Sequence, residues 1–348
     1  MTAPRPVALY AHRGDTTAAE DNSLAAVQAL QDRLRRGAGE RLMGIEGDVR
    51  QMACGTYVMS HYHHHDGVAL AGSRWRDLSP SSRPPTLVEY LAATEGIPLR
   101  NLEIKHLDGD HAAHARSLVR LVGRSTAVDG IRFSTFSPAM ALALARAARP
   151  ARIPVGLLTK SPWALPDDPR ATIARLRGSR AEHADEPHHA AAVVALADAI
   201  GVDQLIPRFT MVGPSLLAAL RETNLRRAAG GKDPITVTTW TVNDASVVAE
   251  LERSCAGLLD GVITDFVDID PHMRAAGTGR PSRKETTPMS PRARRDHALD
   301  RADLRRWASG RQPGSNVALE LWPDAVAITS ARDRGTGAEP IGIELTFG

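Results

Sequence analysis

The sequence predicts a (β/α)₈ barrel that fills most of the chain, followed by a short β-rich extension. About eight units of a short strand and a helical pattern succeed one another between residues 5 and 275. Such alternation favours parallel strands joined by helical crossovers, and the span agrees with the roughly 250 residues of this barrel. A doubly wound open sheet is the competing architecture, but no glycine-rich phosphate-binding pattern follows the first strand.

The expected strands are short apolar or alternating runs that end in polar residues or turns. They cover 7–11, 44–50, 99–105, 131–136, 155–159, 205–206, 235–242 and 261–264. The first helix is expected at 23–34, where Leu24, Val27 and Leu30 follow helical spacing behind Ser23, a candidate N-cap. Further helices are expected at 86–93, 111–122, 139–148, 190–200, 215–221 and 245–252.

The composition changes after residue 277, where prolines occur among Ser, Thr and Arg as in a flexible linker. Strand-like runs then reappear at 317–322, 325–330 and 341–347. The expected organisation is a barrel domain at 1–277, a basic proline-containing linker at 278–299, and a small C-terminal extension of unknown role at 300–348. The basic residues between 274 and 312 are typical of a solvated segment, and contact with acidic lipid or nucleic acid is the alternative.

Composition excludes several classes of protein. With 43% hydrophobic and 24% charged residues and a formal net charge of +3, the chain is an ordinary globular protein and no nucleic-acid partner is expected. Its two cysteines, Cys54 and Cys255, imply no disulfide framework. The N-terminus lacks the apolar run of a signal peptide, and no stretch approaches a membrane span, so a cytoplasmic location is expected.

The stretch from residue 44 to 66 concentrates chemically competent side chains. Glu46 and Asp48 stand two apart on an expected strand and therefore share a face. Paired carboxylates supply the hard oxygen ligands that Ca²⁺ or Mg²⁺ prefers, and His61 adds a group that titrates near neutral pH. The alternative interpretation is a solvated strand face beside loop histidines.

Other expected strands end in polar residues as well. His12 and Arg13 end the first, and Glu103 with Lys105 ends the third. Trp240 lies late in the seventh, and Asp265 ends the eighth. Because a (β/α)₈ barrel carries its active site at the carboxyl ends of its strands, this distribution favours a functional site over a solvated face.

Eight short motifs, in order, resemble the glycerophosphodiester phosphodiesterases, barrel enzymes related to phosphatidylinositol-specific phospholipase C. They are Ala11-His12-Arg13-Gly14, Asp21-Asn22-Ser23-Leu24, Glu46-Gly47-Asp48-Val49, Val58-Met59-Ser60-His61, Leu102-Glu103-Ile104-Lys105, Ser134-Thr135-Phe136-Ser137, Trp240-Thr241-Val242-Asn243 and Gly261-Val262-Ile263-Thr264-Asp265. Each motif alone is weak, whereas the ordered set is specific. It covers residues 6 to 270 and leaves the tail outside.

The resemblance implies a role for each matching residue. His12 and His61 correspond to the paired histidines that act as general base and general acid. Glu46, Asp48 and Glu103 correspond to the ligands of a divalent metal, Ca²⁺ or Mg²⁺. Arg13 and Lys105 correspond to contacts with phosphate oxygens, and Trp240 to a wall of the pocket for the glycerol or the leaving group. An ion pair with Glu103 or Asp48 is the alternative role of Lys105.

The implied reaction is hydrolysis of a small-molecule glycerophosphodiester to glycerol 3-phosphate and an alcohol. In that family the neighbouring glycerol hydroxyl attacks first, and water then opens the cyclic phosphate. Two alternatives stay open: a phosphodiesterase for a lysophospholipid or sugar-phosphate diester, and a catalytically silent barrel that serves as a binding module. The sequence leaves the oligomeric state open.

This chain departs from the family pattern at three places, one of them between the second strand and His61, where Met52 and Cys54-Gly55 replace the usual Thr and Asp-Gly. Asp21-Asn22-Ser23 replaces the usual Glu-Asn-Thr, and Tyr62 follows His61 where an aspartate is usual, with Asp66 a substitute only if the loop folds back. The histidines of this loop also invite a transition-metal interpretation, which is less favoured because loop and helix histidines are mostly solvated. They are His61, His63, His64 and His65, with His106, His111 and His114 further along the chain.

Overall fold

The computed structural model describes residues 7–37, 41–105, 107, 109–125, 127–160, 186–269, 326–328 and 345–347. Parallel strands in them form a closed barrel, because β1 pairs with β11 on one side and with β2 on the other. The barrel strands are β1 (Ala8–His12), β2 (Leu42–Gln51), β6 (Leu99–Ile104), β7 (Ile131–Thr135), β8 (Val155–Thr159), β9 (Gln204–Pro207), β10 (Thr236–Thr239) and β11 (Leu259–Thr264). The predicted barrel is confirmed, and the open sheet is excluded.

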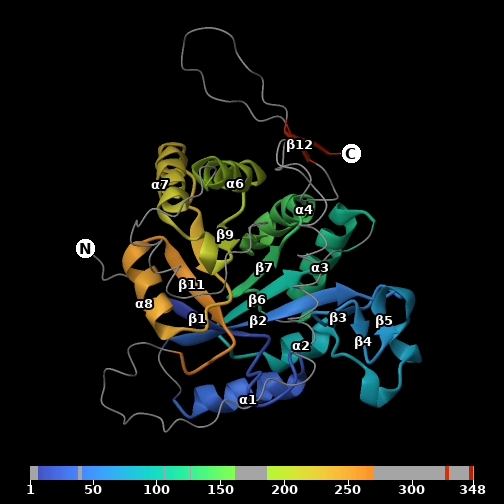
Figure 1. The fold of residues 1–348 in the computed structure, drawn as a ribbon. Helices are drawn as coiled ribbons and strands as arrows, with labels where there is room; N and C mark the ends of the chain where they lie inside the picture. Colours follow the sequence, from blue (N-terminus) through green and yellow to red (C-terminus); the bar gives the residue numbers. More distant parts are fainter. Residues whose placement is uncertain are drawn as a thin grey trace, which may run out of the picture.

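Helices surround the barrel (Figure 1). They are α1 (Leu24–Arg35), α2 (Leu87–Ala93), α3 (His111–Ser125), α4 (Pro138–Ala148), α6 (Glu186–Ile200), α7 (Pro214–Ala229) and α8 (Ala245–Ser254). Ser23 caps α1 as predicted, accepting a hydrogen bond from the Ala26 backbone N–H (3.0 Å). Thr86 and Glu89 form a reciprocal capping box at the start of α2. Helix α7 runs well beyond the predicted end at residue 221, and Thr223 and Arg227 are buried in its later turns.

The connection between β2 and α2 contains structure that the sequence did not predict. Strand β3 (Tyr57–Met59) pairs antiparallel with the end of β2, and β4 (His64–His65) pairs with β5 (Val68–Ala69). Short 3₁₀ turns follow: η1 (Leu70–Gly72), η2 (Trp75–Asp77) and η3 (Pro80–Ser82). A small core of its own holds this insertion, formed by Met52, Val58, Leu70 and Leu78. Figure 1 shows β3, β4 and β5 beyond the end of β2, where they flank the mouth of the barrel.

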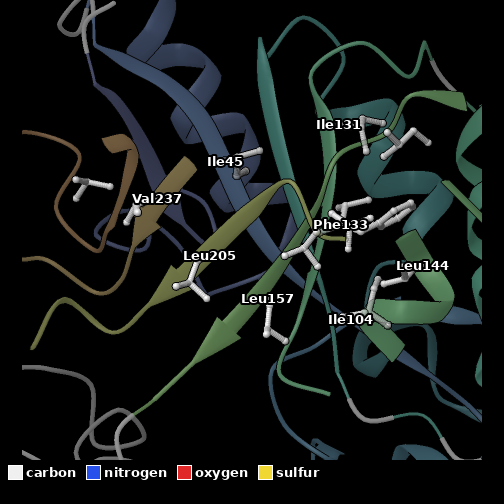
Figure 2. Close-up of a cluster of buried hydrophobic side chains, with 14 of the residues drawn as sticks. Ile45, Ile104, Ile131, Phe133, Leu144, Leu157, Leu205 and Val237 are labelled. Carbon is white, nitrogen blue, oxygen red and sulfur yellow. The ribbon is translucent and has the colours of Figure 1, made fainter. Parts of the chain in front are cut away.

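The main hydrophobic core lies between the barrel wall and the helices. Figure 2 shows outward-facing strand residues such as Ile45, Phe133 and Leu157, with Leu144 of α4 on the side of Phe133. Each is at most 1% exposed. Alternation along the strands sends every second side chain to this layer and the others into the barrel.

The inside of the barrel is filled below the mouth. Tyr10 is fully buried there with Ile206 and Ile263. Its ring occupies the space that glycines leave, since an added Cβ at Gly44 or Gly261 would lie 2.4 or 2.5 Å from it. The barrel is therefore a packed core, and only its mouth is accessible to a substrate.

A polar layer closes the opposite, amino-terminal end of the barrel. Asp260 of β11 accepts hydrogen bonds from Arg132 of β7 (2.8 Å) and from Gln204 of β9 (2.6 Å). All three residues lie at or next to the first position of their strands. Charged groups at this end are satisfied by one another, so they serve the stability of the barrel.

Part of the predicted tail is described. Strands β12 (Val326–Ile328) and β13 (Leu345–Phe347) pair antiparallel and fall within two of the three predicted runs. The third run at 317–322 and the linker at 278–299 lie outside the described residues, and the division into domains stays a prediction. Among the residues that the structure describes, no helix combines the length and hydropathy needed to cross a bilayer.

Candidate active site

The predicted acidic residues meet at the carboxyl-terminal mouth of the barrel. Parallel register aligns Asp48 of β2 with Glu103 of β6, and Glu46 with His12 of β1. One carboxylate oxygen from each of Glu46, Asp48 and Glu103 can be chosen so that all three lie within 4.8 Å of one another. The side-chain alternation assumed from the sequence is therefore confirmed for this group.

Glu46 is the least satisfied member of this acidic cluster. Its residue surface is 2% exposed, and neither carboxylate oxygen accepts a hydrogen bond from the described residues. Among its ion-pair contacts in the described residues, Glu46 has only His12, whose Nε2 lies 3.8 Å from Oε2. Burial, and then the neighbouring Asp48 and Glu103, raise the pKa of the Glu46 carboxyl well above its ordinary value. A buried carboxylate without a donor, beside two others, fits a hard divalent cation.

Asp48, by contrast, lies at the centre of a network of positive charge. Its Oδ1 lies 2.7 Å from Lys105 Nζ, and its Oδ2 lies 3.0 Å from Arg13 Nε and 3.3 Å from His61 Nδ1. Asn22 donates its Nδ2–H to Oδ2 (2.8 Å) and accepts the Asp48 backbone N–H (2.9 Å). Burial alone would raise the pKa of the carboxyl, but Lys105 and Arg13 outweigh it and hold the pKa well below the ordinary value.

Lys105 bridges two members of the cluster. Its ammonium contacts Glu103 as well as Asp48. Both ion pairs weighed from the sequence are therefore present. Burial lowers the pKa of Lys105, but the two carboxylates outweigh that effect and raise it above the usual value, so the side chain stays positively charged.

A strained turn after β1 positions Arg13. Arg13 itself has φ 62°, and Gly14 follows with φ 96° at a point where an added Cβ would lie 2.8 Å from Ala26 Cβ. The Arg13 backbone N–H donates to the Glu46 carbonyl (2.8 Å), which ties this turn to β2. Its guanidinium also pairs with Asp21 (3.2 Å), so this aspartate supports Arg13 and is no member of the acidic cluster.

His12 is oriented by a carboxylate from the last strand. Its Nδ1 lies 2.6 Å from Asp265 Oδ1. Asn243 fixes Asp265 in turn, donating to Oδ2 (2.7 Å) and accepting the Asp265 backbone N–H (2.9 Å). Burial would raise the pKa of Asp265, but the hydrogen bond and charge of His12 lower it to about 2. An ionised carboxylate only accepts, so Nδ1 carries the proton and Nε2 faces the acidic cluster.

His61 approaches the cluster from the insertion after β3. Its backbone carbonyl accepts two hydrogen bonds from the Arg50 guanidinium (3.1 and 2.8 Å), which holds the loop to β2. Tyr62 lies edge-on to its ring at 4.9 Å between centroids. Burial lowers the pKa of His61, although Asp48 acts in the opposite direction. Asp48 is therefore a carboxylate neighbour of the His61 ring, although His61 Nδ1 forms no hydrogen bond with the described residues.

Trp240 directly follows β10 rather than lying within it. Its indole Nε1 donates to the Ile206 carbonyl (3.0 Å), and Phe136 lies edge-on at 5.5 Å. A separate cavity of about 240 Å³ opens beside His61, with Asp21 and Tyr62 among its lining residues. The mouth therefore offers space beside His61.

The histidine-rich loop does not assemble a transition-metal site among the described residues, where the acidic cluster is the one group that could hold an ion. His64 and His65 form strand β4, and His114 contacts the Tyr57 hydroxyl (3.3 Å). His106 lies outside the described residues. The sequence pattern missed the partnership of Asp265 with His12, although both lie at strand ends that neighbour each other in the closed barrel.

No protein-family model matches the chain, and no curated protein matches it. Several solved structures are similar to it. A glycerophosphodiester phosphodiesterase from Parabacteroides distasonis aligns with 78% of this chain and 100% of its own (TM-score 0.53, 18% identity). A glycerophosphodiester phosphodiesterase from Agrobacterium tumefaciens aligns with 76% of this chain and 99% of its own (TM-score 0.51, 16% identity). An Oleispira antarctica phosphodiesterase in complex with the product sn-glycerol-3-phosphate aligns with 77% of this chain and 96% of its own (TM-score 0.50, 19% identity). At these identities the similarity establishes the fold.

Proposed function

We propose that this chain is a metal-dependent phosphodiesterase that hydrolyses a glycerophosphodiester to glycerol 3-phosphate and an alcohol. The observation that carries the proposal is the convergence of three buried carboxylates, two histidines and two cationic side chains on one mouth of the barrel. Its support from outside the chain is a fold shared with glycerophosphodiester phosphodiesterases and with a phosphodiesterase solved in complex with the product sn-glycerol-3-phosphate.

Glu46, Asp48 and Glu103 would hold the metal. Their oxygen donors suit Ca²⁺ or Mg²⁺, and Glu46 has two buried oxygens that no described donor satisfies. When bound, such an ion neutralises the negative charge that builds on the phosphate oxygens during attack.

Arg13 and Lys105 would position the phosphate. Both keep their positive charge, since Asp48 raises the pKa of each against the effect of burial. A planar guanidinium can hold two phosphate oxygens at once, whereas the ammonium of Lys105 supplies a compact charge. Charge placed in advance at the reacting group stabilises the transition state without reorganisation.

The two histidines would transfer the protons. Burial lowers the pKa of His61, so its ring is neutral at pH 7 and able to accept the proton of the attacking glycerol hydroxyl. His12, carrying a proton on both ring nitrogens for this step, would then donate from Nε2 to the departing alkoxide, while Asp265 holds its Nδ1–H. This proposal exchanges the order in which the resemblance gives the two roles. The oxygen–phosphorus bond to the alcohol breaks as the bond to the glycerol oxygen forms. Water opens the resulting cyclic phosphate with the two roles exchanged.

The test is the release of glycerol 3-phosphate from glycerophosphocholine by the full chain, with Ca²⁺ or Mg²⁺ and then with excess chelator. We expect metal-dependent release that chelation abolishes. His12→Gln and His61→Gln should each lower kcat by about 10²–10⁴-fold. His111→Gln, at the start of α3 and outside the cluster, is the control and should keep the wild-type rate.

Two outcomes would redirect the proposal. Turnover confined to lysophospholipid or sugar-phosphate diesters would keep the chemistry and change the substrate. Binding of diesters without turnover would favour the silent binding module. The tail from 278 to 348 is proposed as accessory to the barrel at 1–277, and the cytoplasmic location stays a prediction.

A further inference from the structure

The mouth of the barrel has two chemically different halves. Strands β11, β1, β2 and β6 carry the acidic cluster, the histidine His12 and its partner Asp265. The remaining strands, β7 to β10, end in a different set, which we name the basic aromatic arc: Phe136, Lys160, Arg208 and Trp240. Each residue of the arc directly follows its strand.

Strand alternation directs the arc toward the axis of the barrel. Leu158 and Ile206 belong to the interior cluster, and two residues later the same face carries Lys160 and Arg208. Phe136 and Trp240 pack against this interior cluster directly. The arc thus forms the wall that faces the histidines across the mouth.

Backbone pairing continues through the arc and fixes its residues. Arg208 donates its backbone N–H to the Thr159 carbonyl (2.9 Å) and forms a parallel bridge with Trp240. The indole of Trp240 is anchored on the Ile206 carbonyl, and the ring of Phe136 meets it edge-on. The two rings therefore present a preorganised apolar surface.

Lys160 places an available positive charge on that surface. Its Nζ lies 5.8 Å from the centroid of the Phe136 ring, and its side chain is exposed. In the described part of the chain no carboxylate forms an ion pair with it, whereas Lys105 contacts both Asp48 and Glu103. Arg208 adds a second positive charge at the adjacent strand end.

We propose that the basic aromatic arc is the subsite for the leaving alcohol and selects an alcohol that carries its own phosphate or carboxylate group. This inference rests on the proposed phosphodiesterase function. The glycerol arm takes the opposite side, in the cavity beside His61. Coulomb attraction to the exposed Lys160 favours an anionic alcohol and disfavours a cationic one such as choline.

The experiment compares kcat/KM for glycerophosphoglycerol, its analogue with a phosphate on the leaving glycerol, and glycerophosphocholine. The wild-type chain should prefer the phosphate-bearing diester about twofold to fivefold over the neutral one, the effect of about one exposed ion pair. Lys160→Glu should remove or reverse that preference, mainly through KM. Lys232→Glu, an exposed lysine between α7 and β10 at the far end of the barrel, should keep the wild-type ratio.

A wild-type preference for the neutral or the choline diester would overturn the subsite, as would an unchanged ratio in Lys160→Glu. Calorimetric binding of the three intact diesters to the wild-type and Lys160→Glu chains separates this inference from the proposed function. Selective binding of the phosphate-bearing diester that Lys160→Glu abolishes would support the arc even without turnover. Equal binding of all three would overturn it.

Discussion

Replacing Glu46 by glutamine tests whether the acidic cluster is built for a cation. In the absence of metal, the carboxylate of Glu46 is buried, accepts no described hydrogen bond and faces two further carboxylates. An amide of the same shape removes that repulsion. We therefore expect the melting temperature of the Glu46→Gln variant, measured with chelator, to equal or exceed that of the wild-type chain.

In the presence of metal, the wild-type chain should instead melt at a higher temperature than the Glu46→Gln variant. A ligand at 100 times its Kd stabilises the folded state by about 2.7 kcal/mol. At roughly 2–4 °C per kcal/mol for a domain of this size, the wild-type melting temperature should rise by about 5–11 °C in saturating Ca²⁺ or Mg²⁺. Glu46→Gln loses one charged ligand of three, so its shift should fall below about 2 °C under the same conditions.

Differential scanning calorimetry with and without metal measures both effects. Glu250→Gln is the matched control, because Glu250 is also buried but lies on α8, where its carboxylate is bonded by Arg253 and Ser254. That variant should lose stability and keep the full metal shift. The reasoning is refuted if the wild-type chain shows no shift, if Glu46→Gln shifts equally, or if Glu46→Gln without metal melts several degrees lower.

Three further predictions concern other parts of the molecule. Asp265→Asn should lower kcat by about 10²-fold while KM changes little, because the carboxylate orients His12. The pKa of Asp265 is depressed to about 2, so the stability that its contact with His12 contributes is present above about pH 4 and is lost as the pH falls toward 2. The variant lacks that contribution and should therefore lose less stability than the wild-type chain over this pH range. In the native protein, a thiol reagent should label the exposed Cys54 and spare Cys255, whose pKa burial raises to about 12, and denaturant should expose both to mass-spectrometric detection. Deleting residues 278–348 should leave kcat/KM within about twofold, and a larger loss would give the tail a role in the site.

The sequence pattern anticipated the barrel and the acidic cluster for one physical reason. Parallel strands place their carboxyl ends at the same rim, and a period of two sends Glu46 and Asp48 to the same face. The same argument placed Glu103 beside them, since β6 pairs with β2. Local pattern was sufficient because the relevant geometry is set by the strands themselves.

What the pattern missed depends on contacts between distant segments. The insertion with β3, β4 and β5 consists of strands of two or three residues, too short to show a period. The pairing of Asp265 with His12 joins the first and last strands of the barrel, 253 positions apart, and follows only once the barrel closes. For Lys105 the sequence offered an ion pair with Glu103 or Asp48 as an alternative role, and its contact with both carboxylates at once follows only in the folded cluster.

Phosphorus-31 NMR of a glycerophosphodiester incubated with the full chain and Ca²⁺ or Mg²⁺ tests the central claim most directly. The diester resonance should decay, a cyclic phosphate should appear transiently, and glycerol 3-phosphate should accumulate, with every change arrested by chelator. A diester resonance that persists unchanged with either metal, across glycerol-, choline- and phosphate-bearing substrates, would contradict the assignment of this mouth as a hydrolytic site.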